Sequence, residues 1–453
     1  MYVSPMVNTM VVVSLEPSVS DSQMRITRIA LYVAMLTLGT LIASWVTRTP
    51  TIRNDVGVST VQLGLVLFGV SIGSMVGILS SSRVVRRFGG RRVLATGTGS
   101  AAVGTAIIGL SALVSSPFGV FAGMAAFGFG IGVGEVALNI EAAAVEGRTG
   151  QIILPMVHGF FSLGTVVGAV IGIAANAFRT PVPLHLTIVS GMGAVALALT
   201  LRWIPPGTGR AASTQRATPQ RRRARGVWKN RTVLCIGAIA MATALAEGSA
   251  NDWLPLIFVD GFHVPAVIGS VLFTAFAASM TVGRFAGNRA SAYFARLALL
   301  RLSIVAAMIG VGLVVWAPNV YFAAAAVVLW GLGASLGFPL AISAAGDHPT
   351  DAVARVSAVS VTAYGAFLIG PPMLGTVGGH VGLRYALIIV LLILAIALMS
   401  SSGMQQGPSP SGGSTMSGHD EVGRPSDDGV ASRNGFDPVA TPHDSPCRLG
   451  TPQ

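Results

Sequence analysis

The sequence predicts an all-α membrane protein with about twelve transmembrane helices in two six-helix parallel repeats. Three observations lead to this fold class. Charged residues make up 10% of the 453 residues, whereas soluble domains carry roughly 25%. The mean hydropathy is +0.71, and the apolar residues gather in long runs. The two halves of the chain also repeat each other.

The apolar runs give the expected helices in order, because a helix needs about 20 apolar residues to cross the hydrocarbon core. In the first half the runs lie at 26–46, 60–80, 93–114, 117–140, 153–177 and 182–204. In the second half they lie at 233–255, 265–283, 297–317, 320–344, 355–377 and 382–400. We therefore expect one six-helix bundle over 26–204 and a second over 232–402.

Three polar segments frame these bundles. Residues 1–25 form a short N-terminal tail, and 205–231 form a linker that contains eight lysine and arginine residues. Residues 403–453 are rich in Gly, Ser, Pro and Asp. A segment of that composition cannot bury an apolar core, so we expect the C-terminal tail to be disordered.

The distribution of positive charge predicts the orientation. If the N-terminus is cytoplasmic, 22 lysine and arginine residues fall on the inside and 4 on the outside, with 3 more in the tail. Cytoplasmic loops carry such an excess. We therefore expect both termini and the linker in the cytoplasm, and the protein in the cell inner (plasma) membrane. The net charge of +12 has the same explanation, so no nucleic-acid partner is expected.

The internal repeat has a nearly constant offset. Pro50, Asp55 and Gly64 recur 205 positions later, Arg83 and Phe88 recur 206 later, Gly128, Gly130 and Gly134 recur 203 later, and Gly159 and Gly164 recur 206 later. Six spans per half give both halves the same orientation, so the repeats are parallel and related by an axis along the membrane normal. Transporters of this design bind substrate between the halves.

A basic loop between the second and third runs resembles a known signature. The segment 82–92 reads Ser-Arg-Val-Val-Arg-Arg-Phe-Gly-Gly-Arg-Arg, which is similar to the loop signature of the major facilitator superfamily. The matching positions are Arg83, Arg87, Gly89, Arg91 and Arg92. The chain departs from the pattern at Ser82, where the family has Gly, and at Arg86, where it has an acid that helps to latch the cytoplasmic side.

Three further segments resemble a bacterial subgroup near the fucose permeases. They are Ala-Ser-Trp-Val-Thr-Arg-Thr-Pro at 43–50, Gly-Glu-Val-Ala-Leu-Asn at 134–139 and His-Gly-Phe-Phe-Ser-Leu-Gly at 158–164. The resemblance implies the major facilitator fold over roughly 25–400 and substrate movement by alternating access. It does not imply a fucose substrate, because a fold does not fix the site.

Acidic residues inside the runs are costly and therefore need a reason. Glu135 and Asn139 share one helical face, and so do Glu247 and Asn251. A carboxyl in a low dielectric can hold a proton at neutral pH, so Glu247 and Glu135 are the proton-coupling candidates, with Glu247 favoured. The alternative is a structural carboxyl bound to arginine or backbone. That alternative is favoured for Asp252, Glu141 and Glu146.

Other polar and aromatic residues are candidates for the substrate cavity. With Asn139 and Asn251, they are Arg48, Asp252, Trp253, Trp45 and His158. Each has a structural interpretation. Arg48 can pair with Asp252 or reach the lipid headgroups, the tryptophans can anchor the membrane interface, and the histidine can bond to the backbone at a helix end.

Small residues at four-residue spacing predict close helix packing. Gly69-Gly73-Gly77, Gly164-Gly168-Gly172 and Ser279-Gly283-Gly287 form three such faces. The superfamily places the second, fifth, eighth and eleventh spans at the seam between halves, so these faces fit either rocking of the halves or static packing. Pro371 and Pro372 are expected to break or kink the eleventh span.

These observations favour a monomeric secondary transporter that moves a small organic solute, with proton coupling and a weak preference for a sugar-like or polar substrate. The alternatives are a drug or amphipathic metabolite exporter and a non-transporting receptor or scaffold. We do not expect an enzyme, since no nucleophile–base or metal-ligand constellation appears. We expect no cofactor, and the absence of a phosphate-binding lysine motif leaves ATP-driven transport unsupported.

Overall fold

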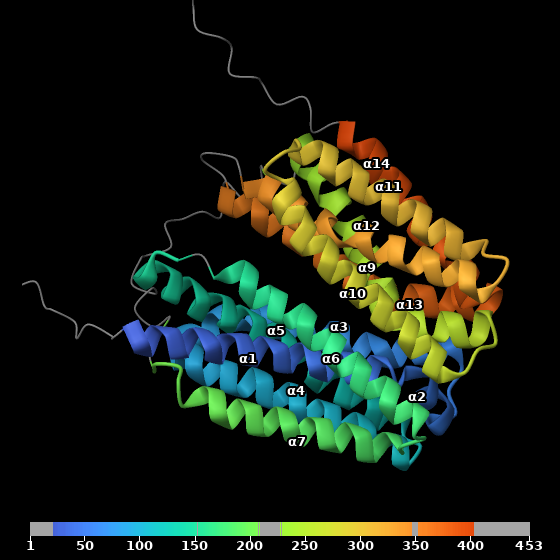
Figure 1. Ribbon diagram of the computed structural model, residues 1–453, viewed down its shortest axis with the longest axis horizontal. Helices are drawn as coiled ribbons and strands as arrows, with labels where there is room; N and C mark the ends of the chain where they lie inside the picture. The colour runs from blue at the N-terminus through green and yellow to red at the C-terminus, as the bar shows by residue number, and fades with distance from the viewer. Residues whose placement is uncertain are drawn as a thin grey trace, which may run out of the picture. The chain divides into compact units, whose positions relative to one another are not determined.

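The structure of the protein is a computed structural model that describes residues 21–151, 153–206, 208, 227, 229–346 and 352–402. The helices of the first half are α1 (Asp21–Val46), α2 (Thr49–Val56), α3 (Thr60–Phe88), α4 (Gly90–Leu113), α5 (Pro117–Thr149), α6 (Leu154–Ala177) and α7 (Val182–Leu201). Those of the second half are α9 (Arg231–Gly261), α10 (Ala266–Ala290), α11 (Arg296–Val315), α12 (Val320–Gly346), α13 (Ala352–Val381) and α14 (Leu383–Ser400) (Figure 1).

Twelve of these helices are long and apolar enough to cross a membrane, which confirms the predicted fold class. Several extend beyond their apolar runs, notably α5 and α9, because polar residues continue the helix past the hydrocarbon core. The short α2 was not predicted. It begins next to Pro50, which suits a first helical turn, and ends at Gly57, whose φ of 70° favours glycine.

The helix pairings confirm the internal repeat. In the first half α1 packs on α6 and α7, while α4 packs on α5 and α7 and α3 packs on α5. The equivalent pairs recur in the second half, where α9 packs on α13 and α14, α11 packs on α12 and α14, and α10 packs on α12. Between the halves, α9 makes small contacts with α1 and α2, and the two largest contacts are α3 with α13 and α6 with α10. These two contacts are equivalent under the repeat, as parallel repeats require.

The predicted small-residue faces lie inside the halves and not at the seam. A Cβ on Gly73 would lie 2.0 Å from the Ala125 carbonyl oxygen of α5, and one on Gly164 would lie 2.1 Å from the Leu36 carbonyl oxygen of α1. Gly283 is similarly close to a side chain of α12. These faces therefore serve static packing, which was one of the two interpretations that the sequence allowed.

The expectation was a break or a kink at Pro371 and Pro372, and α13 is not broken there but continues through both prolines. Pro371 has no N–H, which leaves the carbonyl of Phe367 without its partner in the helix. Ser71 of α3 donates its hydroxyl to that carbonyl oxygen at 2.5 Å. The second half thus exposes a backbone acceptor at the seam, and the first half supplies its donor.

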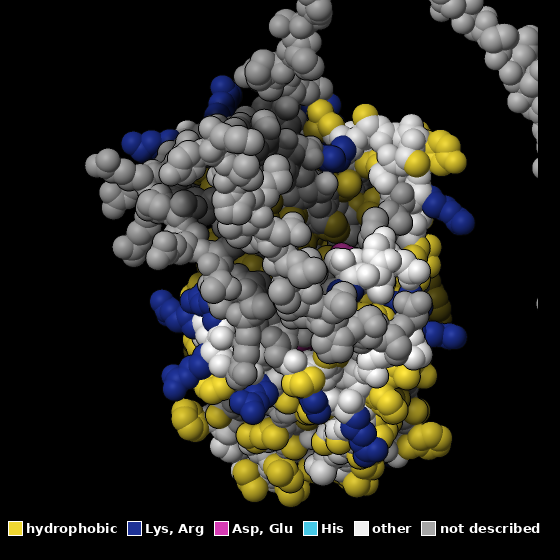
Figure 2. All heavy atoms as spheres, turned by 90° about the vertical axis from the view of Figure 1, so that its left-hand side faces the viewer, with side chains coloured by type: hydrophobic (Ala, Val, Ile, Leu, Met, Phe, Trp, Pro, Cys, Tyr) yellow, Lys and Arg dark blue, Asp and Glu magenta, His cyan; other side chains and the backbone are white. Residues whose placement is uncertain are grey.

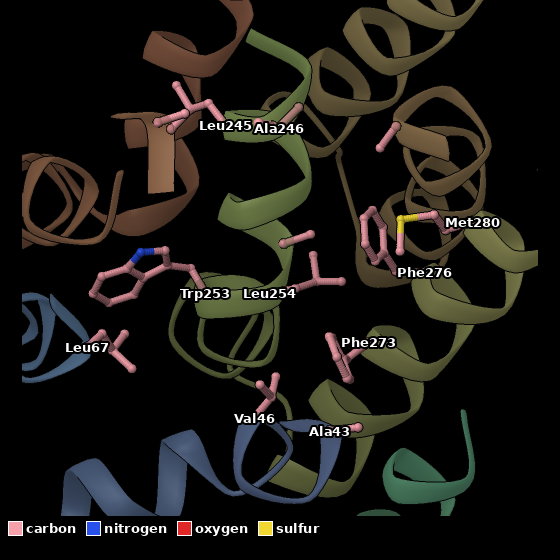
Figure 3. Close-up of a cluster of buried hydrophobic side chains, with 14 of the residues drawn as sticks. Ala43, Val46, Leu67, Leu245, Ala246, Trp253, Leu254, Phe273, Phe276 and Met280 are labelled. Carbon is pink, nitrogen blue, oxygen red and sulfur yellow. The ribbon is translucent and has the colours of Figure 1, made fainter. Parts of the chain in front are cut away.

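The described helices pack around buried aromatic and aliphatic side chains. Trp253 of α9 projects toward Leu67 of α3, and Phe273 and Phe276 of α10 lie on the other side of α9 (Figure 3). Helix association in lipid depends on close packing and polar contacts, because the surrounding acyl chains are themselves apolar. All the described helices belong to one compact unit. The expectations for 1–20, most of the linker and the tail after 402 lie outside the described residues.

Candidate functional site

An ion pair between α9 and α10 lies inside two helices that are long and apolar enough to span a membrane. Arg284 donates from Nη2 to Glu247 Oε1 at 3.0 Å and from Nη1 to Ser162 Oγ of α6, also at 3.0 Å. Both charged side chains are half-buried. The guanidinium therefore links an acid of its own half to a hydroxyl of the other half.

Three more titratable side chains interact electrostatically with this ion pair or with one another. Glu135 of α5 is acted on by the charges of Glu247 and Arg284. Tyr364 of α13 is acted on by the charge of Glu135, and His158 of α6 by that of Arg284. These five residues come from five different helices and from both halves. In the view of Figure 2, small areas of acidic side chain are visible near the middle of this face of the molecule.

Glu135 is the acid of this cluster that has no counter-ion at bonding distance. Among the described residues it forms neither an ion pair nor a hydrogen bond, whereas Glu247 bonds Arg284. One turn further along α5, Asn139 has a buried Oδ1 that likewise has no partner among them. The carboxyl of Glu135, the amide of Asn139 and the guanidinium of Arg284 can therefore each form further hydrogen bonds.

Asn251 and Asp252 lie one turn beyond Glu247 on α9 and are half-buried. Their side chains form no hydrogen bond or ion pair with the described residues. Pro255, four residues after Asn251, leaves the Asn251 carbonyl without a helical N–H partner. This stretch of α9 therefore carries an amide and a carboxyl without described partners, and a backbone carbonyl that lacks its helical donor.

Arg48 was expected to line the substrate cavity, pair with Asp252 or reach the lipid headgroups, but it is buried among residues of its own half. It is 3% exposed, donates at 2.6 Å to Asn176 Oδ1 and at 2.6 Å to the Thr180 carbonyl, and does not bond Asp252. Burial lowers the pKa of Arg48, with nearby Asp55 opposing the shift. Burial likewise raises the pKa of Asp55, with Arg48 opposing. The guanidinium holds the corner between α1 and α2 against the end of α6.

The two candidate tryptophans belong to the packed interior, each 1% exposed. Trp45 packs edge-on against Phe127 at 5.8 Å between ring centroids. Trp253 touches Gly375 of α13, 3.2 Å from where a Cβ would stand. Neither ring lies open to a solute or at an exposed interface position in this conformation.

Polar contacts also join the two halves near the end where α1 finishes. Arg53 of α2 and Asp260 of α9 form a bidentate ion pair, in which Arg53 Nη2 donates to Asp260 Oδ1 at 2.9 Å. Ser270 of α10 donates to the Thr47 carbonyl at 3.1 Å and accepts from Asn176 Nδ2 at 2.9 Å.

The remaining acids of α5 have structural positions. Glu141 is 1% exposed and lies against Gly90, at the positive end of the α4 dipole. Glu146 Oε1 accepts from the N–H groups of Ile153 at 2.7 Å and Leu154 at 2.8 Å, which caps α6. In the signature loop, Gly89 has a φ of 84°, a value that favours glycine.

The sequence analysis missed Arg284, Ser162 and Tyr364. Arg284 was counted as a loop arginine because the predicted span ended at 283, whereas α10 continues to Ala290. The signal for Arg284 was its position only one residue beyond an uninterrupted apolar run. Ser162 and Tyr364 carried no such signal, because isolated hydroxyls are common in membrane helices.

Comparison with known proteins identifies the family. The family model of the Major Facilitator Superfamily matches residues 29–367. An uncharacterised transporter of Sinorhizobium fredii is 27% identical over 373 residues, covering 81% of this chain and 95% of that protein. The membrane protein MosC of Rhizobium meliloti is 26% identical over 370 residues, covering 80% of this chain and 86% of that protein.

Solved transporter structures share the fold. The nucleoside transporter NupG, in a mutant form, superimposes with a TM-score of 0.70 at 13% identity, covering 83% of this chain and 99% of NupG. The E. coli fucose:proton symporter FucP has a TM-score of 0.59 at 16% identity, covering 84% of this chain and all of FucP. With twelve apolar helices, two repeated halves and a family match over most of its length, the chain is a multi-pass membrane transporter that belongs to the major facilitator superfamily.

Proposed function

We propose that this transporter moves a small polar organic solute by alternating access and couples that movement to protons through Glu135 and Glu247. The supporting observation is the imbalance between two acids and one arginine. Arg284 bonds Glu247 at 3.0 Å, while Glu135 has no counter-ion at bonding distance among the described residues. An unpaired carboxylate inside a span is expensive, so the free acid binds a proton.

The coupling follows from the position of Arg284 between the halves. Its guanidinium has five N–H donors, and two of its nitrogens bond Glu247 and Ser162. When the halves rock, the contact with Ser162 of α6 changes, and Arg284 can exchange Glu247 for Glu135. The acid released by Arg284 then takes up a proton from the compartment to which the site is open.

The solute is proposed to bind beside this pair. Asn139, Asn251 and Asp252 supply amide and carboxyl groups without described partners, and they flank Glu135 and Glu247 on α5 and α9. Such groups favour a solute with several hydroxyl or amino groups, since an unpaired buried polar group is costly. The structures of FucP and NupG are described as those of a fucose:proton symporter and a nucleoside transporter, and both kinds of solute carry several hydroxyl groups.

Proton movement in proteoliposomes tests the proposal. Vesicles that contain a pH-sensitive dye are exposed to a panel of sugars, nucleosides, amino acids and polyols, and a solute that the protein couples to protons changes the internal pH. Glu135→Gln and Glu247→Gln are each expected to abolish that pH change while exchange of labelled solute continues. Asp55→Asn, which lies outside the cluster, is the control.

The result that would refute the coupling mechanism is a Glu135→Gln or Glu247→Gln protein with the same solute-driven pH change as Asp55→Asn. If the unaltered protein accumulates a solute without any change of internal pH, the protein is a transporter that does not couple this solute to protons. The yield of each variant and its solute exchange activity are measured as well, because they show whether a folded protein is present.

Export of amphipathic compounds is the second candidate. An open apolar groove lies along the seam between α3 and α13, lined by Phe68, Leu368, Ile369, Pro372, Met373, Thr376 and Val377. A groove of this kind gives a lipid-dissolved molecule a lateral path between the halves. If the protein is such an exporter, it should protect cells from hydrophobic dyes. Met373→Trp in the groove should abolish this protection, whereas Met399→Trp at an exposed position of α14 should not.

A further inference from the structure

The outward face of α3 ends in arginines. Leu65, Ile72, Val76 and Leu79 are 36–65% exposed and follow one another at intervals of seven, four and three residues, so they form a single stripe along the helix. In a membrane protein such an apolar stripe faces acyl chains. The same stripe continues into Arg83 and Arg86, both exposed, at the level where the apolar surface stops.

This basic patch, defined as Arg83, Arg86, Arg87, Arg91 and Arg92, has no acid within its stretch of sequence. Arg83, Arg86 and Arg92 form no ion pair or hydrogen bond with any described residue. Arg87 lies over the ring of Phe88, 5.3 Å from its centroid, and that ring is 43% exposed. Arg83, Arg86 and Arg92 of the patch, which have no described counter-ion, therefore adjoin an exposed apolar surface.

The repeat shows that the fold does not require this charge. The equivalent loop between α10 and α11 keeps the exposed Phe294 and has arginine only at Arg289 and Arg296. Lys and Arg side chains lie around the whole of this end of the molecule (Figure 2), but the loop of the first half concentrates five of them in ten residues. The loop of the first half thus carries three more arginines than the equivalent stretch of the second half.

We propose that the basic patch binds the phosphate of an anionic phospholipid headgroup. Arginine matches phosphate oxygens with paired N–H donors, and clusters of four to eight basic residues next to a span bind anionic lipids. The acyl chains of the same lipid lie along Val76 and Leu79. A soluble phosphate compound uses only the arginines, whereas a lipid also uses the stripe, so the continuity between the two favours the lipid.

The occupant is measured by native mass spectrometry of the full chain in detergent, titrated with phosphatidylglycerol or with phosphatidylcholine of the same acyl chains. The test variant is Arg83→Gln with Arg86→Gln, and the matched control is Arg202→Gln with Arg289→Gln, two exposed arginines outside the patch. One arginine at a membrane surface contributes about fivefold to binding. The test variant is therefore expected to weaken phosphatidylglycerol binding about thirtyfold and the control much less.

Three outcomes would overturn the proposal. If both double variants lose phosphatidylglycerol binding equally, the arginines attract the lipid only through general surface charge. If the unaltered protein binds phosphatidylcholine as tightly as phosphatidylglycerol, the negative charge of the lipid plays no part. Displacement of the lipid by millimolar glycerol phosphate would assign the patch to a soluble phosphate. If the test variant is not monodisperse, Arg86→Gln alone decides the matter, with an expected weakening of about fivefold.

Discussion

The ion pair between Arg53 and Asp260 is expected to hold the outer ends of the two halves together. Asp260→Asn keeps the size of the side chain and removes its charge. The two side chains are 17% and 34% exposed, so the pair is partly screened by solvent. Exposed ion pairs contribute about 0.2–1 kcal/mol, and the bidentate geometry places this one at the upper end. Its loss should shift the balance toward outward opening by up to about fivefold.

The repeat supplies a matched control. Asp55 occupies the position equivalent to Asp260 in the first half and forms no described ion pair across the seam. Asp55→Asn therefore makes the same chemical change at the same end of the molecule without breaking a cross-half contact. Arg53→Gln should reproduce the effect of Asp260→Asn, and the two changes together should add little to either one, since they remove the same interaction.

Spin labels on the two outer loops measure the opening. Val114 and Trp316 follow the equivalent helices α4 and α11 and are 70% and 62% exposed. Each is replaced by Cys and labelled, in a protein whose own Cys235 and Cys447 are replaced by Ser. Asp260→Asn should increase the long-distance population between these labels, and Asp55→Asn should not. Identical distance distributions for the two variants would show that the ion pair does not close the outer side.

Three further predictions rest on single contacts. Gly128→Ala would place a methyl group 2.0 Å from the Val70 carbonyl oxygen, so it should lower the thermal stability by about 1–3 kcal/mol; Gly191→Ala, with open space around it, should not. Ser71→Ala leaves the Phe367 carbonyl unpaired and should cost about 1–3 kcal/mol, measured by unfolding in detergent, while Ser71→Thr should retain most of the stability. Reporter fusions at 208 and 410 should give cytoplasmic signals, and a periplasmic signal at either site contradicts the orientation expected from the arginines.

The helices were predictable because each depends on a run of neighbouring residues. The apolar runs located all twelve spans. The offset of about 205 residues predicted the repeat that the equivalent pairs α1 with α6 and α9 with α13 now show. The close approach at Gly73 and Gly164 also followed from local spacing. The short α2 escaped because its eight residues carry no apolar run.

The partners of the site residues were less predictable, because periodicity fixes the face of a helix but not the helix that it meets. Glu135 and Glu247 were correctly placed within spans, yet nothing local to either one indicates Arg284 or Ser162 as a neighbour. Arg48 illustrates the same limit. Its position at a helix end suggested the cavity or the headgroups, and its burial follows from Asn176 of α6 and Thr180 just beyond that helix, more than 120 residues away.

The placement of Arg284 explains why the site is built from both halves. A guanidinium inside a span is costly unless it is paired, and Glu247 of the same half supplies that pair at 3.0 Å. A single pair of this kind would be electrically complete and would have no need of Ser162 or Glu135. The first half adds a hydroxyl that bonds the arginine and an acid with no counter-ion of its own at bonding distance. The charge balance of the cluster therefore depends on how the halves face each other. In the proposed mechanism, the proton that neutralises the extra acid links alternating access to the proton gradient.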